Sequence, residues 1–111
     1  MSKNVLATFQ SVVNGDMSAD IVSAVTDIRW LDNMVMYIDF TGTPTGTFSA
    51  ETSPDQVSWY ALNLVPSPVA SGSAGNHRID MNQLPDPYIR TKYTRTSGTG
   101  TLNVKIAGKL V

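Results

Sequence analysis

The side chains best suited to catalysis are few in this chain and poorly spaced for it. His77 is the single histidine, so a Ser–His–Asp triad would have to use it as the general base. Asp80 follows three residues later, and in a β-strand that offset places the two side chains on opposite faces. No Gly-x-Ser-x-Gly elbow is present to expose a nucleophilic serine. The sequence therefore predicts that the protein is not an enzyme, with His77 an ordinary polar residue at the margin of a loop.

Metal, cofactor and phosphate sites find equally little support. The chain has no cysteine, which excludes disulfides and thiolate ligands. Its acidic residues are scattered: Asp16, Asp20, Asp27, Asp32, Asp39, Glu51, Asp55, Asp80 and Asp86. They match no EF-hand loop. A calcium site assembled from separate loops remains an alternative, but the spacing of the acidic residues gives it no support. The segments "GTGT" and "GSAG" lack the following lysine and helix that a phosphate-binding loop needs. No metal and no cofactor is predicted.

Charge is distributed unevenly along the chain. Residues 1–86 hold three basic and nine acidic side chains, a net charge of −6. Residues 87–111 hold five basic and no acidic ones, a net charge of +5. Two interpretations remain open: a basic part of a sheet that lies beside acidic neighbours of the same chain, or a surface that contacts an acidic partner.

The segment "YTRTSGTGTLNVKI", residues 93–106, alternates apolar and polar residues around a Gly-Thr pair. It predicts a β-hairpin with a type II′ turn at residues 98–99. In that register Lys92 lies directly opposite Lys105, and like charges in such pairs are destabilising unless an acidic surface docks there or the side chains splay into water. The predicted partner-contact residues are Arg90, Lys92, Arg95 and Lys105. A nucleic-acid partner is not expected, because the patch is short and the sequence pI is about 5.6.

Two neighbouring aromatic residues, Trp59 and Tyr60, could form a stacking platform for a sugar. Aromatic residues in small β-domains are more typical of the core, because they supply the largest buried area. The core is therefore the preferred interpretation for both. An exposed Trp59 or Trp30 would instead favour glycan binding.

The elements that must position these side chains alternate apolar and polar residues with a period of two. The predicted strands cover residues 5–13, 22–30, 34–40, 47–51, 57–65 and 77–81, followed by the hairpin whose first arm is residues 88–96. Alternation places Val5, Ala7, Phe9 and Val13 on one face of the first strand, and Val22, Ala24, Ile28 and Trp30 on one face of the second. A helix is the alternative at residues 18–25. A turn is predicted at Asn14-Gly15, a long loop at residues 66–76 and a turn at residues 82–87.

The strand at residues 34–40 is predicted to be central and covered on both faces, because it carries apolar side chains on each. One face has Met34, Met36, Ile38 and Phe40, and the other has Val35 and Tyr37. Substitution of Ile38 should therefore be costly.

Length and composition bound the fold class. The chain has 111 residues, of which 41% are hydrophobic and 15% charged, enough for one modest core. Short strands separated by frequent turns predict an all-β fold: one domain, residues 1–111, built as an antiparallel β-sandwich (jelly-roll or Ig-like) or a small barrel. No signal sequence or membrane-spanning segment is recognised. The expectation is a soluble protein made in the cytoplasm, with no membrane partner.

The C-terminal two thirds of the chain resemble a segment that recurs in tailed-phage virion proteins. The resemblance is carried by the aromatic-rich "VSWYALNLV", the Ser/Gly/Ala loop, "IDMN", "YIR" and the closing "TSGTGTL" that ends in Gly-Lys. The preceding "GTFSAETSPD" is similar to the strand and turn that come before that segment in such proteins. The first thirty residues carry no resemblance.

The resemblance implies assembly rather than catalysis. A phage virion structural protein is expected, in the form of a subunit that decorates or cements the capsid and is located in the virion. The implied partners are other copies of the chain, as a dimer or trimer, and other virion proteins such as the major capsid protein. The alternative is a carbohydrate-binding module that recognises a host surface.

Overall fold

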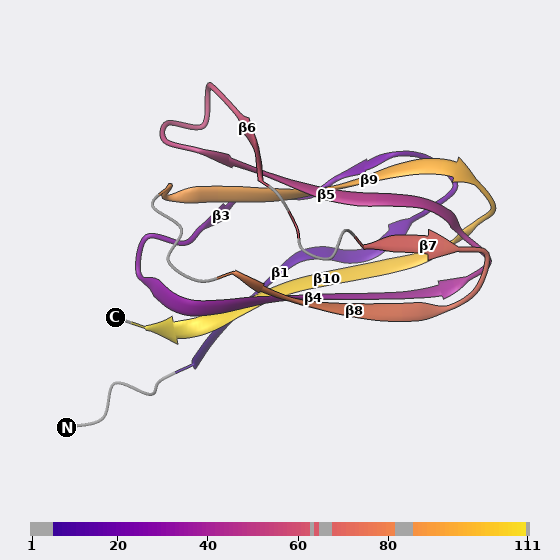
Figure 1. Cartoon of the computed structure of the whole chain (residues 1–111), viewed down its shortest axis with the longest axis horizontal. Coiled ribbons are helices and arrows are strands. Elements are labelled where there is room, and N and C mark those ends of the chain that lie inside the picture. The colour runs from indigo at the N-terminus through magenta and orange to yellow at the C-terminus, as the bar shows by residue number, and fades with distance from the viewer. Residues whose placement is uncertain (1–5, 63, 65–67, 82–85, 111) are drawn as a thin grey trace.

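The computed structural model describes residues 6–62, 64, 68–81 and 86–110 of the chain. These residues form ten β-strands and no helix, in two antiparallel sheets stacked as layers (Figure 1). They accordingly contain no helix long and apolar enough to cross a membrane. The prediction of an all-β fold is confirmed.

Each layer has a defined strand order. Sheet A has the order β1-β10-β4-β8, and sheet B has the order β2-β9-β5-β6 with β3 beside β9 and β7 beside β5. The strands of sheet A are β1 (Leu6–Asp16), β4 (Leu31–Gly42), β8 (Gly75–Met81) and β10 (Gly100–Leu110). The strands of sheet B are β2 (Ile21–Val22), β3 (Thr26–Asp27), β5 (Thr45–Ser53), β6 (Tyr60–Leu62), β7 (Val69–Ser71) and β9 (Tyr88–Ser97).

The chain crosses repeatedly from one layer to the other. It passes from sheet A to sheet B between β1 and β2, between β4 and β5, and back again between β9 and β10. Strands far apart in the sequence, such as β1 and β10, therefore become neighbours. This is the double Greek-key order of a jelly roll. The predicted antiparallel β-sandwich is confirmed, and among the alternatives the strand order selects the jelly roll.

The predicted hairpin at residues 93–106 is wrong. β9 pairs with β5 in sheet B, whereas β10 lies between β1 and β4 in sheet A. Gly98 and Thr99 therefore carry the chain across the sandwich, although Gly98 has the positive φ (78°) that the turn prediction required. Alternation identifies which side chains of each strand point inward, but it does not show which strands pair. Two strands in opposite sheets, packed across the core, have the same alternation as two strands paired in one sheet.

The core lies between the two sheets. Its fully buried side chains include Met34, Met36, Ile38, Ile89, Tyr93, Leu102, Val104 and Ile106. β4 is central in sheet A, as predicted, and Ile38 is 0% exposed. The outer face of β4 is only partly covered: Val35 is buried, Tyr37 is half-buried and Asp39 is exposed. The prediction that residues 34–40 are covered on both faces is thus wrong for the outer face, because none of the described strands packs over it.

The first strand departs from simple alternation. β1 continues through Asn14 and Gly15, where a turn was predicted, and its pairing with β10 is irregular on both sides of Val12. An irregularity of this kind inserts a residue and shifts the face on which later side chains lie. Val12 is consequently buried and Val13 is exposed, the reverse of the prediction. Val5, assigned to the same face, lies outside the described residues.

The segments around residues 22–30 and 66–76 also differ from expectation. The first forms only the short strands β2 and β3, and of its predicted inward face (Val22, Ala24, Ile28 and Trp30) only Ile28 is buried. The predicted loop at residues 66–76 contains β7. Residues 65–67 and residues 82–85 of the predicted turn lie outside the described residues.

Candidate functional site

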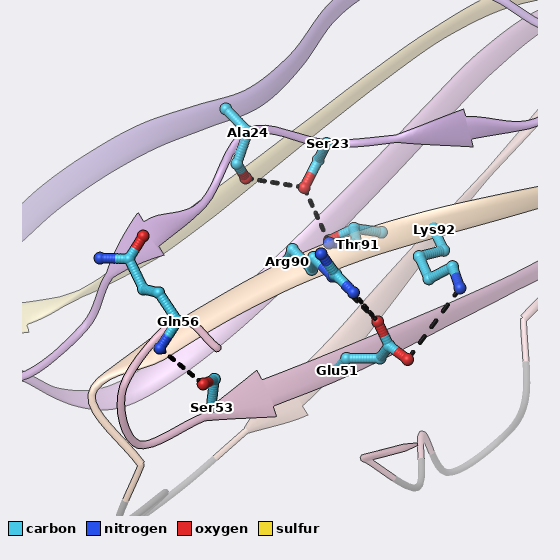
Figure 2. A network of polar contacts seen from close by, with 8 residues as sticks. All are labelled: Ser23, Ala24, Glu51, Ser53, Gln56, Arg90, Thr91 and Lys92. Atoms are coloured by element: carbon cyan, nitrogen blue, oxygen red, sulfur yellow. Dashed lines mark hydrogen bonds and ion pairs between the residues drawn. The ribbon is translucent and has the colours of Figure 1, made fainter. Parts of the chain in front are cut away.

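Two of the predicted contact residues lie on the outer face of sheet B and share one carboxylate, as Figure 2 shows. Arg90 of β9 and Glu51 of β5 are direct cross-strand partners. Arg90 Nε donates to Glu51 Oε1 at 2.9 Å, and Arg90 Nη2 lies 2.8 Å from the same oxygen. Lys92 Nζ lies 4.0 Å from Glu51 Oε2. Cross-strand pairs of opposite charge contribute roughly 0.2–1 kcal/mol each.

The Arg90 guanidinium also covers an aromatic ring. Its central carbon lies 4.1 Å from the centroid of the Trp59 ring, close enough for a cation–π interaction of about 0.5–1 kcal/mol at an accessible site. Trp59 immediately precedes β6, which pairs with β5 by placing Ala61 opposite Glu51. The four residues Glu51, Trp59, Arg90 and Lys92 are called the Glu51 cluster below.

The anchoring of Thr91, which lies between Arg90 and Lys92 on β9, explains why the cluster projects outward. The intervening Thr91 is buried, and its backbone N–H donates to Ser23 Oγ at 2.8 Å (Figure 2). The Ser23 N–H in turn donates to Thr91 O at 2.8 Å. Thr91 Oγ1 also lies 3.8 Å from Met36 Sδ in the opposite sheet. Because neighbouring side chains of a strand point to opposite faces, the anchoring of Thr91 fixes Arg90 and Lys92 on the solvent side.

The other two predicted contact residues lie elsewhere. Arg95 is near the end of β9, where its Nε donates to Gly98 O at 2.9 Å. Lys105 belongs to β10 and lies on the outer face of sheet A, with Nζ 5.7 Å from the centroid of the Tyr37 ring. The predicted stripe, with Lys92 directly opposite Lys105, is therefore wrong, because the two lysines belong to different sheets.

The structure distinguishes these cations by their acidic neighbours. Ion pairs within the described residues involve Arg29, Arg78, Arg90 and Lys92. Arg95 and Lys105 have no acidic side chain within ion-pair distance in this part of the chain. Arg95 is nevertheless held beside a carboxylate, because its backbone N–H donates to Asp20 Oδ1 at 2.8 Å. An acidic partner would therefore meet Lys105 directly, whereas at Arg90 and Lys92 it would have to compete with Glu51.

Two exposed carboxylates are stabilised in their charged form by local donors. The backbone N–H groups of Ser58 and Val57 lower the pKa of Asp55. The side chain of Arg29, hydrogen-bonded to Asp27, lowers the pKa of that carboxyl. Both arrangements are local to a turn or a short strand. Among the residues that the structure describes, no group of three or more His, Cys, Asp or Glu side chains is placed to hold a metal ion.

His77 lies within β8 rather than at the margin of a loop. Its ring centroid is 6.0 Å from that of Phe40 and 6.2 Å from that of Phe48, and Nε2 lies 2.8 Å from Val69 O. Asp80 is exposed on the other face of the strand, so the predicted separation of the two side chains is confirmed. His77 thus contributes to packing and to the contact between β8 and β7.

The aromatic residues proposed for the core lie outside it. Tyr60 is exposed, and Trp59 is half-buried beneath Arg90 on the outer face. The core interpretation of this pair is wrong because β6 is a short strand at the edge of sheet B. Trp30, between β3 and β4, is 66% exposed.

The sequence did not indicate Glu51 as a site residue. The outward position of Glu51 follows from alternation, but its pairing with Arg90 depends on which strands are neighbours.

Comparison with known proteins identifies a fold rather than a family. Neither a model of a known protein family nor a curated protein sequence matches the chain. Among solved structures, the SPBc2 prophage-derived protein YomS is similar over 97% of this chain and 99% of its own, with a TM-score of 0.61 and 6% identity. PirA matches over 98% and 96% with a TM-score of 0.50 and 12% identity. A carbohydrate-binding module of family 29 matches over 95% and 89% with a TM-score of 0.50 and 7% identity. At these identities the likeness shows that the chain shares their β-sandwich fold.

Proposed function

We propose that the chain is a structural, protein-binding subunit of a phage particle, one that decorates or cements the capsid. The observation that carries the proposal is the extent of the likeness to a prophage-derived protein, 97% of this chain and 99% of that one. The resemblance of residues 57–109 to tailed-phage virion proteins supports the same role. A role in the virion also agrees with a surface that offers cations and apolar side chains for protein contacts.

The partners in this proposal are other copies of the chain and the capsid lattice. Exposed apolar side chains such as Val13, Val22 and Val57 are available for contacts between copies. Lys105, which has no acidic side chain within ion-pair distance among the described residues, is available for an acidic group of the lattice, whereas the backbone N–H of Arg95 already donates to Asp20 Oδ1 at 2.8 Å. We expect a dimer or trimer in sedimentation experiments, because cyclic closure is the usual form of such assemblies. A strict monomer both in solution and on the particle would contradict this part of the proposal.

Electron microscopy of particles made with and without the gene tests the role directly. The expected result is extra density at regular lattice positions that disappears in the deletion and returns when purified protein is added. Replacement of Lys105 by Thr should slow the return at low salt, with less effect at high salt where charges are screened. Particles that lack the protein in both cases would refute the proposed role.

Glycan recognition is the second candidate function, and one observation favours it. Trp30 is 66% exposed, which is the condition set out above for an aromatic side chain that stacks on a sugar. The likeness to a carbohydrate-binding module supports this candidate only at the level of the shared β-sandwich fold. Loss of polysaccharide binding in Trp30→Ala would support this candidate. Unchanged binding would show that Trp30 is not part of a glycan site.

A further inference from the structure

The outer face of sheet A carries a row of polar side chains across three neighbouring strands. Asn103 of β10 is the direct cross-strand partner of Asp39 of β4, and Asp39 is that of Asn76 of β8. Direct partners point to the same face, so this Asp39 row presents an amide, a carboxylate and a second amide side by side. Asp39 and Asn76 are exposed, and Asn103 is half-buried. With strands about 4.8 Å apart, the row extends over roughly 10 Å.

A groove of about 420 Å³ lies at this row. Its other walls include Thr41, Ala74 and Thr101, whose small side chains leave the end of the sheet hollow. The volume falls within the roughly 300–1,000 Å³ of small-molecule sites. A second hollow of about 100 Å³, which shares Asp39 and Asn103, extends toward β1 and the Lys105 side chain. The polar row therefore lies in an open, shallow hollow that continues toward β1.

The side chains of the row retain hydrogen-bonding capacity. Asn103 Oδ1 accepts the backbone N–H of Asn14 at 2.9 Å, which leaves the Asn103 amide nitrogen as a donor. Among the residues that the structure describes, no hydrogen bond or ion pair engages the Asp39 carboxylate. An ionised carboxylate only accepts, whereas an amide both donates and accepts. A hydroxyl also donates and accepts, so closely spaced hydroxyl groups can satisfy this mixture.

The charge around the groove is balanced. The adjoining row places Lys105 and Arg78 on either side of Tyr37, with Lys105 Nζ 5.7 Å from the ring centroid. Arg78 is paired with Asp80 at 2.9 Å. This part of the face therefore has two positive groups, Lys105 and Arg78, and two negative groups, Asp39 and Asp80. With this balance it has no strong preference for a charged ligand. Tyr37 adds a half-buried aromatic surface beside the polar row.

We propose that this groove is a binding site for a neutral oligosaccharide, with the Asp39 carboxylate accepting hydrogen bonds from sugar hydroxyls, Asn103 donating to them, and Asn76 both donating and accepting. The site deepens the second candidate function by naming where a glycan would bind, and it does not depend on the role in the virion. It lies on the sheet opposite to the Glu51 cluster and at the far end of β4 from Trp30.

Affinity electrophoresis of the full chain tests the site, with gels that contain galactomannan, mixed-linkage β-glucan or dextran, and polygalacturonate as the acidic comparison. We expect retardation by at least one neutral polysaccharide and none by polygalacturonate. Asp39→Asn should weaken binding about tenfold to a hundredfold, the range for losing hydrogen bonds to a charged group. Asp80→Asn is the matched control: it makes the same chemical change on the same face but outside the groove, and its affinity should stay within about threefold of the wild type.

Each other outcome is decisive. Absence of binding to all three neutral polysaccharides, or binding by Asp39→Asn at wild-type strength, would overturn the site. Equal losses in Asp39→Asn and Asp80→Asn would also overturn it, because they would indicate a general effect of charge. Binding abolished by Trp30→Ala but not by Asp39→Asn would move glycan recognition to Trp30. Because Asp39 is exposed, its variant should unfold at the wild-type urea midpoint. Failure of the virion role would appear separately, as particles without this chain.

Discussion

The crossing of the chain between sheets at Gly98 can be tested by adding a single methyl group. Gly98 has a φ of +78°, and a Cβ there would collide with Thr43 O and lie 3.2 Å from Pro44 Cα. Thr43 and Pro44 belong to the other connection between the sheets at this end, and the Thr43 N–H donates to Thr99 O at 2.8 Å. Gly98→Ala therefore strains the local backbone and also pushes two crossings apart.

The expected magnitude follows from these two terms. The left-handed conformation of a non-glycine residue costs roughly 1–2 kcal/mol. Displacing a packed backbone oxygen adds about 1–3 kcal/mol, as overpacking does elsewhere. Gly72→Ala is the matched control: its φ is +86°, but the atom nearest to the added Cβ is Thr45 Oγ1 at 3.6 Å, an ordinary contact. Gly98→Ala should thus lose about 2–5 kcal/mol of unfolding free energy, and Gly72→Ala about 1–2 kcal/mol.

Urea denaturation followed by circular dichroism measures both losses. The difference between the two variants isolates the collision, since both substitutions reduce the freedom of the unfolded chain equally. If β9 and β10 formed a hairpin in one sheet, Gly98 would sit at an exposed turn and the two losses would be equal. Equal losses with unchanged m-values would therefore refute the crossing.

Three further predictions concern the core, the Glu51 cluster and the response to acid. Ile38→Ala should lose about 2–5 kcal/mol of unfolding free energy, and a loss below about 0.5 kcal/mol in the same titration would contradict its burial. Glu51→Gln should lose roughly 0.5–1 kcal/mol at low salt and less in about 1 M NaCl; a loss that does not depend on salt would argue against the ion pairs with Arg90 and Lys92. The lowered pKa of Asp55 means that its contribution is present above the ordinary value of 3.8 and is lost as pH falls through the folded value. Asp55→Asn should accordingly be less stable than the wild type at neutral pH and converge with it in acid, and a constant difference down to about pH 2 would count against the hydrogen bonds from the turn.

The sequence was sufficient to predict the long strands β4, β5 and β9 and most of the core, because side-chain alternation is a local property, but it did not predict the short strands β2, β3, β6 and β7 correctly. Met36 and Ile38 lie inward as predicted, and no helix forms at residues 18–25. Local departures were harder to foresee. The irregular pairing beside Val12 reverses the faces of later residues, and nothing in the alternation of residues 5–13 requires it. Similarly, β6 is short and at an edge, so Tyr60 is exposed in spite of its type.

The pairing of strands could not be predicted, and the candidate sites depend on it. Glu51 meets Arg90 because β5 lies beside β9, and Asp39 meets Asn76 and Asn103 because β4 lies between β8 and β10. These neighbours are set by how the whole chain wraps, which depends on packing between sheets rather than on any local signal. From the sequence alone, Asp39 is only one of several scattered acidic residues, and Asn76 falls in the predicted loop at residues 66–76.

The same wrapping explains why the positive charge of residues 87–111 does not form one basic face. In a jelly roll the last two strands belong to different sheets, so the segment contributes β9 to sheet B and β10 to sheet A. On sheet B, Arg90 and Lys92 meet Glu51, which comes from the acidic part of the sequence. On sheet A, Lys105 lies opposite Tyr37 and apart from those two cations. A charge imbalance along the sequence becomes a surface patch only when the charged strands are neighbours in space. Here the crossing at Gly98 places them in different sheets, and an acidic partner would meet cations on two separate faces rather than a continuous stripe.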